Sequence, residues 1–462
     1  MTSYFVHFLF LWSLSVMASA EPAGCKIRIT DRGLDMLKYE TQKFVEEELS
    51  NISMPEMKGE DGRFQYTITD VKITELNLTH ADLQFIPDVG LLFDVQNSSI
   101  SLTFNRRILY WFFYDTGNIN ASAEGVNINT ALNLIRDEEG RLKINNITCD
   151  ANISKMSAKF SGTLGRVYGF LARFLTTGMR FLLNQKICPA LDHAALVLVN
   201  SLLETIPVRT EVDQFIGIDY SLIDDPVVTS RSLDMHFRGM FFDLSHQNVS
   251  LVNYAVEPVI KEYDRMVYLA LSEFFFDSGL FSYYTAGVFQ MHIVNEKMPK
   301  DLEMLLRTTY FGLIMMLNPA LVDAPLSLQL AVNSPPKTSI KTSGATVVMT
   351  AIVNVMVLPP GQPPVQLSSM TMVYTHTHTH THTHTHTHTH THTLKTLIPL
   401  QAPLKTMLQM SVVPLINNWT KRGVRIPLAD GVDFIEEVVE YHNVSVILPL
   451  DYLRSFRLFS YL

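Results

Sequence analysis

Side chains that could do covalent chemistry are present, but not at the spacings that catalytic sites need. The chain contains no Gly-x-Ser-x-Gly elbow, no His-Glu-x-x-His pair and no glycine-rich phosphate loop. Residues 161–165, Ser-Gly-Thr-Leu-Gly, superficially suggest a lipase but put the serine in the wrong place. The neighbours Asp192 and His193 are better explained as a capping and surface pair than as a catalytic dyad. The sequence therefore predicts a protein that is not an enzyme and that needs no cofactor.

Histidine is concentrated in one tract. Residues 375–393 alternate strictly between Thr and His, with histidine at every even position from His376 to His392. In an extended strand these imidazoles would share one face at intervals of about 6.6–6.8 Å, and such a row can capture Zn²⁺ or Cu²⁺. A CA dinucleotide repeat read in frame also encodes only His and Thr, and it explains the perfect alternation more simply. We therefore assign no metal site.

Three cysteines, Cys25, Cys149 and Cys188, determine the covalent cross-linking. In an oxidising compartment two of them should pair. Cys149 and Cys188 form the better pair, because the first ends a strand-like segment and the second follows a long helical one. Closing that loop should contribute about 3–4 kcal/mol on a chain-entropy model. Cys25 is then left unpaired or bonded to another chain.

The N-terminus predicts secretion. Residues 8–16 are apolar and residues 18–20, Ala-Ser-Ala, fit a small-residue cleavage site, so we interpret residues 1–20 as a signal peptide. A buried N-terminal helix is the alternative, because no Lys or Arg precedes the apolar run. Glycosylation sequons support an extracellular protein. They lie at Asn51, Asn77, Asn97, Asn120, Asn146, Asn152, Asn248, Asn418 and Asn443.

The charge of the chain argues against nucleic acid as a partner. Its formal net charge is −9 at pH 7, whereas nucleic-acid-binding domains carry basic patches. Residues 151–191 are the exception, since they contain Lys and Arg but no Asp or Glu. Their basic side chains repeat along a predicted helix, and they are interpreted either as its solvated edge or as a membrane contact.

The order of predicted elements indicates two similar halves. A helix over residues 31–49 precedes period-2 segments from about 64 to 150, which are typical of antiparallel strands with one buried face. Helices follow over about 164–185 and from Pro189 to about 203. Thr30 and Ser272 are the expected N-caps of the first helix in each half. We therefore expect an N-terminal unit over 21–240, a linker over 241–262, and a C-terminal unit over 263–462 that the tract at 375–393 interrupts.

Several stretches resemble one protein family. They are residues 27–35, 216–222, 263–276, 286–288 and 423–428, together with Cys149, Cys188 and the helix between them. The chain resembles the bactericidal permeability-increasing and lipopolysaccharide-binding protein family, especially its family C branch. The resemblance implies an α+β fold, an elongated boomerang of two pseudo-symmetric antiparallel β-barrels with long packed helices, joined by a central sheet. It also implies the Cys149–Cys188 disulfide and an apolar phospholipid pocket beside each barrel.

Candidate walls of those pockets come from the aromatic and aliphatic residues of the helices. Each of these side chains could instead belong to the ordinary core, since aliphatic and aromatic residues are the types most often buried. The candidates are Phe170, Phe174 and Leu182 in the first half, and Phe275, Phe281 and Tyr284 in the second. Because the Thr-His tract occupies the place of two or three strands, little sequence remains to complete the second barrel.

A hairpin tip is expected on the first barrel, where endotoxin-binding relatives carry several basic residues. Here only Arg106 and Arg107 supply positive charge. The residues that follow are aromatic: Tyr110, Trp111, Phe112, Phe113 and Tyr114. If exposed, this tip suits insertion at a membrane interface; the alternative is a buried strand.

The sequence thus predicts a secreted lipid-binding or lipid-transfer protein. Its expected partners are a phospholipid or another amphipathic lipid and a membrane surface, and an innate-immune role is compatible with the resemblance. The alternative function is binding of bacterial lipopolysaccharide through the tip, as an antibacterial protein. This alternative is weaker, because anionic lipid A would need charge-assisted bonds and the tip has few donors.

Overall fold

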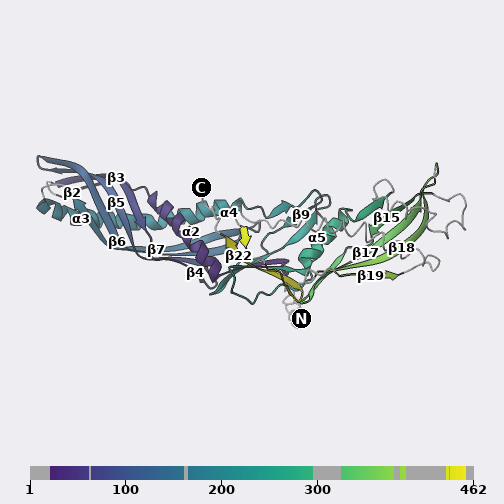
Figure 1. Cartoon of the computed structure of the whole chain (residues 1–462). Coiled ribbons are helices and arrows are strands. Elements are labelled where there is room, and N and C mark those ends of the chain that lie inside the picture. The colour runs from purple at the N-terminus through teal and green to yellow at the C-terminus, as the bar shows by residue number, and fades with distance from the viewer. Residues whose placement is uncertain are drawn as a thin grey trace, which may run out of the picture.

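The computed structural model describes residues 21–61, 64–160, 165–294, 324–359, 361–378, 385–391, 433–435 and 438–453. These residues form an elongated α+β molecule with a long curled sheet at each end and a shorter sheet between them (Figure 1). The predicted fold class is confirmed. Two predictions, the signal peptide over 1–20 and the sequon at Asn418, lie outside the described residues.

The N-terminal sheet has the strand order β2-β3-β5-β6-β7, with β4 paired to β5. Its strands are β2 (Met57–Asp61), β3 (Phe64–Asn77), β4 (Ala81–Ile86), β5 (Gly90–Tyr110), β6 (Phe113–Arg136) and β7 (Leu142–Phe160). Along β5 buried and exposed residues alternate, because successive side chains of a strand point to opposite faces. The buried face packs against two helices, α2 (Asp31–Ser50) and α3 (Gly165–His193).

Helix α3 covers this sheet with an apolar stripe. Its buried residues recur every fourth position, as the helical period requires: Leu175, Met179, Leu183, Ile187 and Leu191. A break at Pro189 was expected, but α3 continues through it to His193. A helical proline removes one backbone donor, and here Pro189 lies on the exposed side while Ile187 and Leu191 stay packed. A π-helix, η1 (Ala194–Val199), and a short helix, α4 (Asn200–Glu204), follow.

The central sheet joins the two halves. It runs β10 (Val227–Val228), β11 (Ser232–Phe237), β1 (Cys25–Thr30), β13 (Val267–Ser272), β22 (Ser445–Leu453) and β20 (Asp433–Ile435), with β21 (Glu440–His442) also on β22. β1 and β13, the first strand of each half, pair antiparallel, with Cys25 opposite Leu271. Arg28 in β1 holds Asp234 of β11 through two 2.7 Å hydrogen bonds and donates another to the carbonyl of Ile260. The buried charge is therefore fully engaged.

Thr30 and Ser272 begin the two equivalent helices, but their hydroxyls do not cap them. Neither side chain bonds to its own helix. Each bonds instead to the segment that leads into the neighbouring strand: Thr30 Oγ1 donates to the carbonyl of Arg265 at 2.5 Å, and Ser272 Oγ donates to that of Gly24 at 3.1 Å. The expectation of side-chain capping was wrong, because the antiparallel pairing of β1 and β13 brings acceptors from the other half within reach.

The C-terminal sheet repeats the plan of the first. Its order is β14-β15-β17-β18-β19, with β16 on β17. The strands are β14 (Gln290–Ile293), β15 (Leu326–Val332), β16 (Lys337–Lys341), β17 (Gly344–Val357), β18 (Val365–His378) and β19 (Thr385–Thr391), and helix α5 (Glu273–Thr285) links them to β13. The Thr-His tract ends β18 and forms β19. It thus supplies strands of this sheet, contrary to the expectation that few could form there.

A small sheet lies beside the centre. It consists of β8 (Arg209–Glu211), β9 (Ile216–Asp219) and β12 (Met240–Asp243), in the order β12-β9-β8. The segment from residue 244 to 266 contains no strand or helix, whereas residues 241–243, at the start of the predicted linker, belong to β12. The proposed domain limits at 240 and 263 stay predictions.

Candidate functional site

The aromatic hairpin between β5 and β6 is the most exposed apolar feature of the N-terminal sheet. Tyr110 pairs with Phe113, so Trp111 and Phe112 form a two-residue turn. Phe112 is 93% exposed, and the side chains around it are more than half exposed: Tyr110, Trp111, Phe113 and Tyr114. Trp111 has φ of 56°, a conformation that such turns usually assign to Gly, Asn or Asp. The alternative of a buried strand is therefore wrong for this tip.

Arg106 does not contribute charge to the exposed tip. The residue is 5% exposed; its Nε donates to Asp115 at 3.0 Å and its Nη1 to the carbonyl of Asn118 at 3.2 Å. A Cβ at Gly117 would lie 3.1 Å from the guanidinium carbon, so that glycine leaves room for the buried group. Arg107, the next residue, is exposed. The predicted role of Arg106 as a surface contact was wrong. Arg106 lies at an even-numbered position of β5, and the even-numbered positions Phe104 and Ile108 on either side of it face the core.

The first set of pocket candidates is only partly described. Leu182 in α3 is half-buried, while its neighbour Leu183 is fully buried and Phe181 is 61% exposed. The side chains of Phe170 and Phe174 lie outside what the structure describes. The helical stretch Leu175–Glu204 is long and apolar enough to cross a membrane by length and composition, and 28% of its most apolar part is buried; core helices pass the same test. Among the described side chains of this stretch, the large apolar ones that remain exposed are Phe181, Leu196 and Val197.

The second set of candidates lies on α5. Phe275 is 8% exposed and stacks edge-on against Phe241 and Phe276, with ring centroids 5.1 and 5.4 Å apart. It belongs to the core beneath the central sheet. Phe281 and Tyr284 are half-buried, and the Tyr284 hydroxyl donates to the carbonyl of Asn333 at 3.2 Å. Of the three, Phe281 and Tyr284 thus keep surface that a ligand could contact.

The cysteines are arranged as the residues and the resemblance indicated. Cys149 in β7 and Cys188 in α3 form a disulfide with a Cα–Cα distance of 5.6 Å. Cys25 is free and 3% exposed. Its burial raises the pKa of its thiol to about 12, so it stays a neutral thiol at physiological pH. Of the two outcomes expected for Cys25, the structure thus contains the unpaired one.

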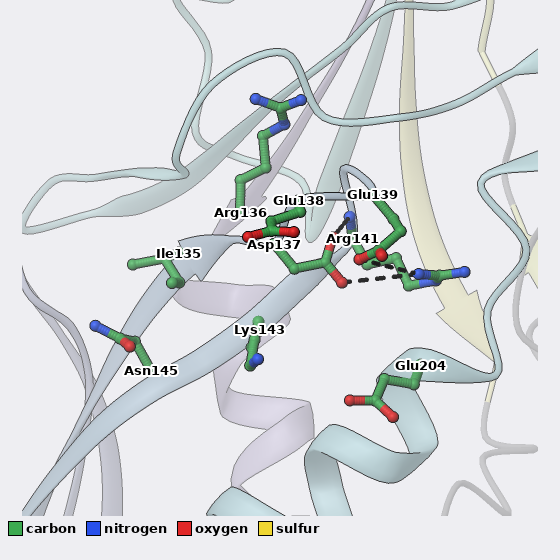
Figure 2. A pocket seen from close by; sticks show the side chains of 9 residues that line it. All are labelled: Ile135, Arg136, Asp137, Glu138, Glu139, Arg141, Lys143, Asn145 and Glu204. Atoms are coloured by element: carbon green, nitrogen blue, oxygen red, sulfur yellow. Dashed lines mark hydrogen bonds and ion pairs between the residues drawn. The ribbon is translucent and has the colours of Figure 1, made fainter.

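A cavity of about 610 Å³ opens where β6 turns into β7 (Figure 2). Its lining is mostly charged: acidic Asp137, Glu138, Glu139 and Glu204 and basic Arg136, Arg141 and Lys143, with Ile135 and Asn145. Arg141 binds the carboxylates of Asp137 and Glu139, at 3.8 and 3.7 Å. Acyl chains gain free energy from apolar walls, so this cavity is not the expected lipid pocket.

Comparison with known proteins places these features in a family. The N-terminal domain of the LBP / BPI / CETP family matches residues 33–206, and its C-terminal domain matches residues 210–451. This chain belongs to the LBP / BPI / CETP family. The family resemblance noted in the sequence is confirmed.

The prediction that the chain is most similar to the family C branch was wrong. The chain is 51% identical to human phospholipid transfer protein, over 96% of this chain and 92% of that protein, and 49% identical to the mouse protein over 96% and 93%. Human BPI fold-containing family C protein is 28% identical over 62% of this chain and 58% of its own length. The residues that carry the resemblance thus identified the family and not the branch.

A solved structure supports the fold over nearly the whole chain. The crystal structure of lipopolysaccharide binding protein aligns with 94% of this chain and 99% of its own, with a TM-score of 0.66 and 21% identity. At this identity the likeness concerns the fold alone.

Two features of the site were not predicted from the sequence. The alternation of side chains along β5 could have indicated the Arg106–Asp115 pair. It places Arg106 on the same face as Phe104 and Ile108, and all three are buried. The turn at Trp111 had no such signal, because its positive φ falls on a residue type that seldom adopts it.

Proposed function

We propose that this family member is a secreted protein that binds phospholipids and transfers them between lipid surfaces, without catalysis. The exposed aromatic tip is the observation that carries the proposal. Tyr and Trp rings have an apolar body and a polar edge, which suits the boundary between lipid headgroups and acyl chains. The similarity to two phospholipid transfer proteins over nearly the full chain supports the same function.

Apolar surface elsewhere supports a carried lipid. Exposed Phe181 on α3 and the half-buried Phe281 and Tyr284 on α5 are the side chains we assign to contact with acyl chains. Each methylene withdrawn from water contributes about 0.8 kcal/mol. A two-chain lipid would therefore leave chiefly to another apolar surface, and the tip would bring the protein to one.

Secretion is part of the proposal. The sequon asparagines that lie within the described residues are all exposed: Asn51, Asn77, Asn97, Asn120, Asn146, Asn152, Asn248 and Asn443. Glycans at these positions would extend into solvent without disturbing the core. The disulfide fits an oxidising compartment as well.

Transfer of a fluorescent phospholipid between vesicles tests the proposal. The variant Trp111→Ser/Phe112→Ser removes two apolar groups, each worth about 1.5 kcal/mol when buried, so we expect about 100-fold weaker vesicle association and correspondingly slower transfer. The matched control is Val252→Ser/Tyr254→Ser in the linker, where both side chains are also exposed, 61% and 88%. Equal losses in both variants, or wild-type protein that carries no extractable phospholipid and transfers none, would contradict the proposal.

Lipopolysaccharide binding through the tip is the less favoured function. Its charge would have to come from Arg107, because Arg106 is buried against Asp115. Human lipopolysaccharide-binding protein is also more distant, at 28% identity over 66% of this chain and 64% of that protein. Strong binding of lipopolysaccharide that is lost in Arg107→Ala would revive it.

A further inference from the structure

A buried ion pair lies next to the aromatic tip, on a face of the sheet that is otherwise apolar. The side chain of Arg106 in β5 is 3% exposed, and its Nη2 lies 3.0 Å from Oδ2 of Asp115 in β6. The neighbouring positions on the same face of β5, Phe104 and Ile108, are apolar and buried. Apolar residues of similar volume often replace a buried ion pair without loss of stability, so stability alone does not explain this one. The best-attested use of such a pair is to fix how two segments align.

The tip residues do not define their own register. Every residue from Leu109 to Tyr114 is apolar or aromatic and at least 39% exposed. Register is strongly specified where one face of a strand is buried, and weakly specified where neither face is. A one-residue slip confined to the tip needs only a β-bulge. It would produce a three-residue loop, which is the next most common hairpin connection after the two-residue turn.

The observed register also strains Trp111. Because Tyr110 pairs with Phe113, Trp111 is the first residue of the turn, and its φ is 56°. For a bulky residue a positive φ is an outlier, and it persists only where the surrounding structure over-determines it. The exposed tip offers no buried packing that could do so. The contacts that hold this register therefore lie in the strands that lead to the tip.

The geometry of the ion pair depends on the register. Arg106 stands opposite Gly117, and Asp115 stands opposite Ile108. The guanidinium occupies the space that a side chain at Gly117 would fill, since a Cβ there would lie 3.1 Å from Cζ of Arg106. A one-residue slip would turn Asp115 to the other face of the sheet and would take Gly117 away from its place opposite Arg106. Only the observed register thus keeps both the pair and the space for it.

We propose that Arg106, Asp115 and Gly117 are positioning residues, which fix the register of the tip and so present Trp111 and Phe112 at its turn. They act through the backbone of β5 and β6 and do not themselves contact lipid. That the two aromatic rings enter a lipid surface rests on the proposed function. The register itself can be measured without lipid.

A cross-strand disulfide measures the register. Arg107 and Thr116 are exposed and stand directly opposite each other, and directly paired residues lie within the Cα separation that a disulfide needs. Arg107→Cys/Thr116→Cys should therefore cross-link in air, as followed by peptide mass spectrometry. Adding Arg106→Met/Asp115→Leu should slow cross-linking by about 10-fold, because relief of the strain in the turn leaves about a tenth of the molecules in this register.

Association with phosphatidylcholine vesicles tests the consequence for lipid binding. Arg106→Met/Asp115→Leu keeps every tip residue and should unfold in urea near the wild-type midpoint. It should bind vesicles about 10-fold more weakly, in proportion to the competent fraction. Adding the oxidised disulfide between positions 107 and 116 should restore the affinity to that of the same disulfide with the ion pair intact. The matched control has serine at positions 107 and 116 and should stay weak.

Two results would overturn the proposal: cross-linking at an unchanged rate without the ion pair, or weak vesicle binding that the disulfide does not restore. If Arg106→Met/Asp115→Leu does not fold, Gly117→Val decides instead, because its branched side chain takes the space of the guanidinium while both charged residues remain. Slower cross-linking in that variant supports the proposal, and an unchanged rate contradicts it. Wild-type protein that binds no vesicles contradicts the proposed function alone, since cross-linking reports the register without lipid.

Discussion

The two curled sheets share a strand order but end differently. In the N-terminal sheet, β5 and β6 are joined by two residues, Trp111 and Phe112, within an exposed aromatic tip. In the C-terminal sheet, the equivalent strands β17 and β18 are joined by residues 358–364, Leu-Pro-Pro-Gly-Gln-Pro-Pro, which include no aromatic residue. The common plan thus follows from strand alternation and pairing, whereas the exposed aromatic cluster, to which we assign contact with a lipid surface, is confined to one turn.

The sheets also differ in how a helix is fixed to them. In the first half the Cys149–Cys188 disulfide joins β7 to α3 above a continuous apolar stripe. In the second half α5 holds the edge of β16 with two carboxylates: Glu273 accepts the N–H of Ile340 at 2.7 Å, and Asp277 accepts that of Thr338 at 2.6 Å. The first attachment is a covalent bond beside apolar packing. The second consists of two hydrogen bonds from backbone N–H groups to carboxylates.

Removing the covalent attachment should have the largest effect. Cys149→Ser/Cys188→Ser opens a loop with a sequence separation of 39 residues, and the chain-entropy model gives a loss of about 4 kcal/mol. Calorimetry should show the transition of the N-terminal half at a lower temperature and that of the C-terminal half unchanged. Wild-type protein under reducing conditions is the control and should behave like the variant. An equal shift of both transitions would mean that the halves do not unfold separately.

The two arginines at the tip should differ by several-fold in their effect on stability. Arg106→Ala leaves Asp115 without its partner, and breaking a buried pair costs about 3 kcal/mol. Arg107→Ala changes an exposed residue and should stay within about 0.5 kcal/mol. Urea unfolding measures both. Equal effects would show that Arg106 is not held as its hydrogen bonds indicate; Arg106→Ala/Asp115→Ala should recover part of the loss.

Replacing the polar attachment should come next in size. Glu273→Ala/Asp277→Ala leaves two backbone donors of β16 without acceptors, at a combined cost of about 2–3 kcal/mol. Glu273→Gln/Asp277→Asn keeps an oxygen acceptor at each position and should stay near the wild type. Hydrogen exchange at the amides of Thr338 and Ile340 reports the change directly. Protection that persists in the alanine variant would show that other groups hold this edge.

How far the sequence could predict the molecule depends on the range of the interactions. The helix at 31–49, the alternating strands and the cysteine pair rest on local patterns, and the structure contains them. Thr30 and Ser272 are the N-cap residues that the sequence predicts, but local sequence could not show that their hydroxyls donate to Arg265 and Gly24, more than 200 residues away in the chain. The sequence predicts a break at Pro189, because the packing that keeps α3 continuous there is tertiary. Composition alone could not show that the Thr-His tract continues two paired strands.

Acidification should have the smallest effect on the stability of the two halves, and it should act through half-buried Asp277 in one half and buried Asp219 in the other. Burial raises the pKa of Asp277, and nearby Glu273 adds to this, against the hydrogen bond from Thr338. Burial alone would also raise the pKa of Asp219 in β9, but hydrogen bonds from Ser221 and ion pairing with Arg209 lower it. The folded state therefore holds the proton of Asp277 more tightly than the unfolded state does, and that of Asp219 less tightly.

The two groups thus affect stability in opposite directions. The penalty of ionising half-buried Asp277 is full above its raised pKa and disappears as pH falls toward about 4, the ordinary pKa of Asp. Asp277→Asn should therefore be more stable than the wild type at pH 7.5, by less than the effects above, and this advantage should shrink by pH 4.5. Asp219→Asn should be less stable than the wild type at both values, because the contribution of Asp219 is lost only as pH falls below about 4. Urea unfolding at the two pH values measures both variants, and an Asp277→Asn advantage that does not change with pH would mean that its source is packing and not charge.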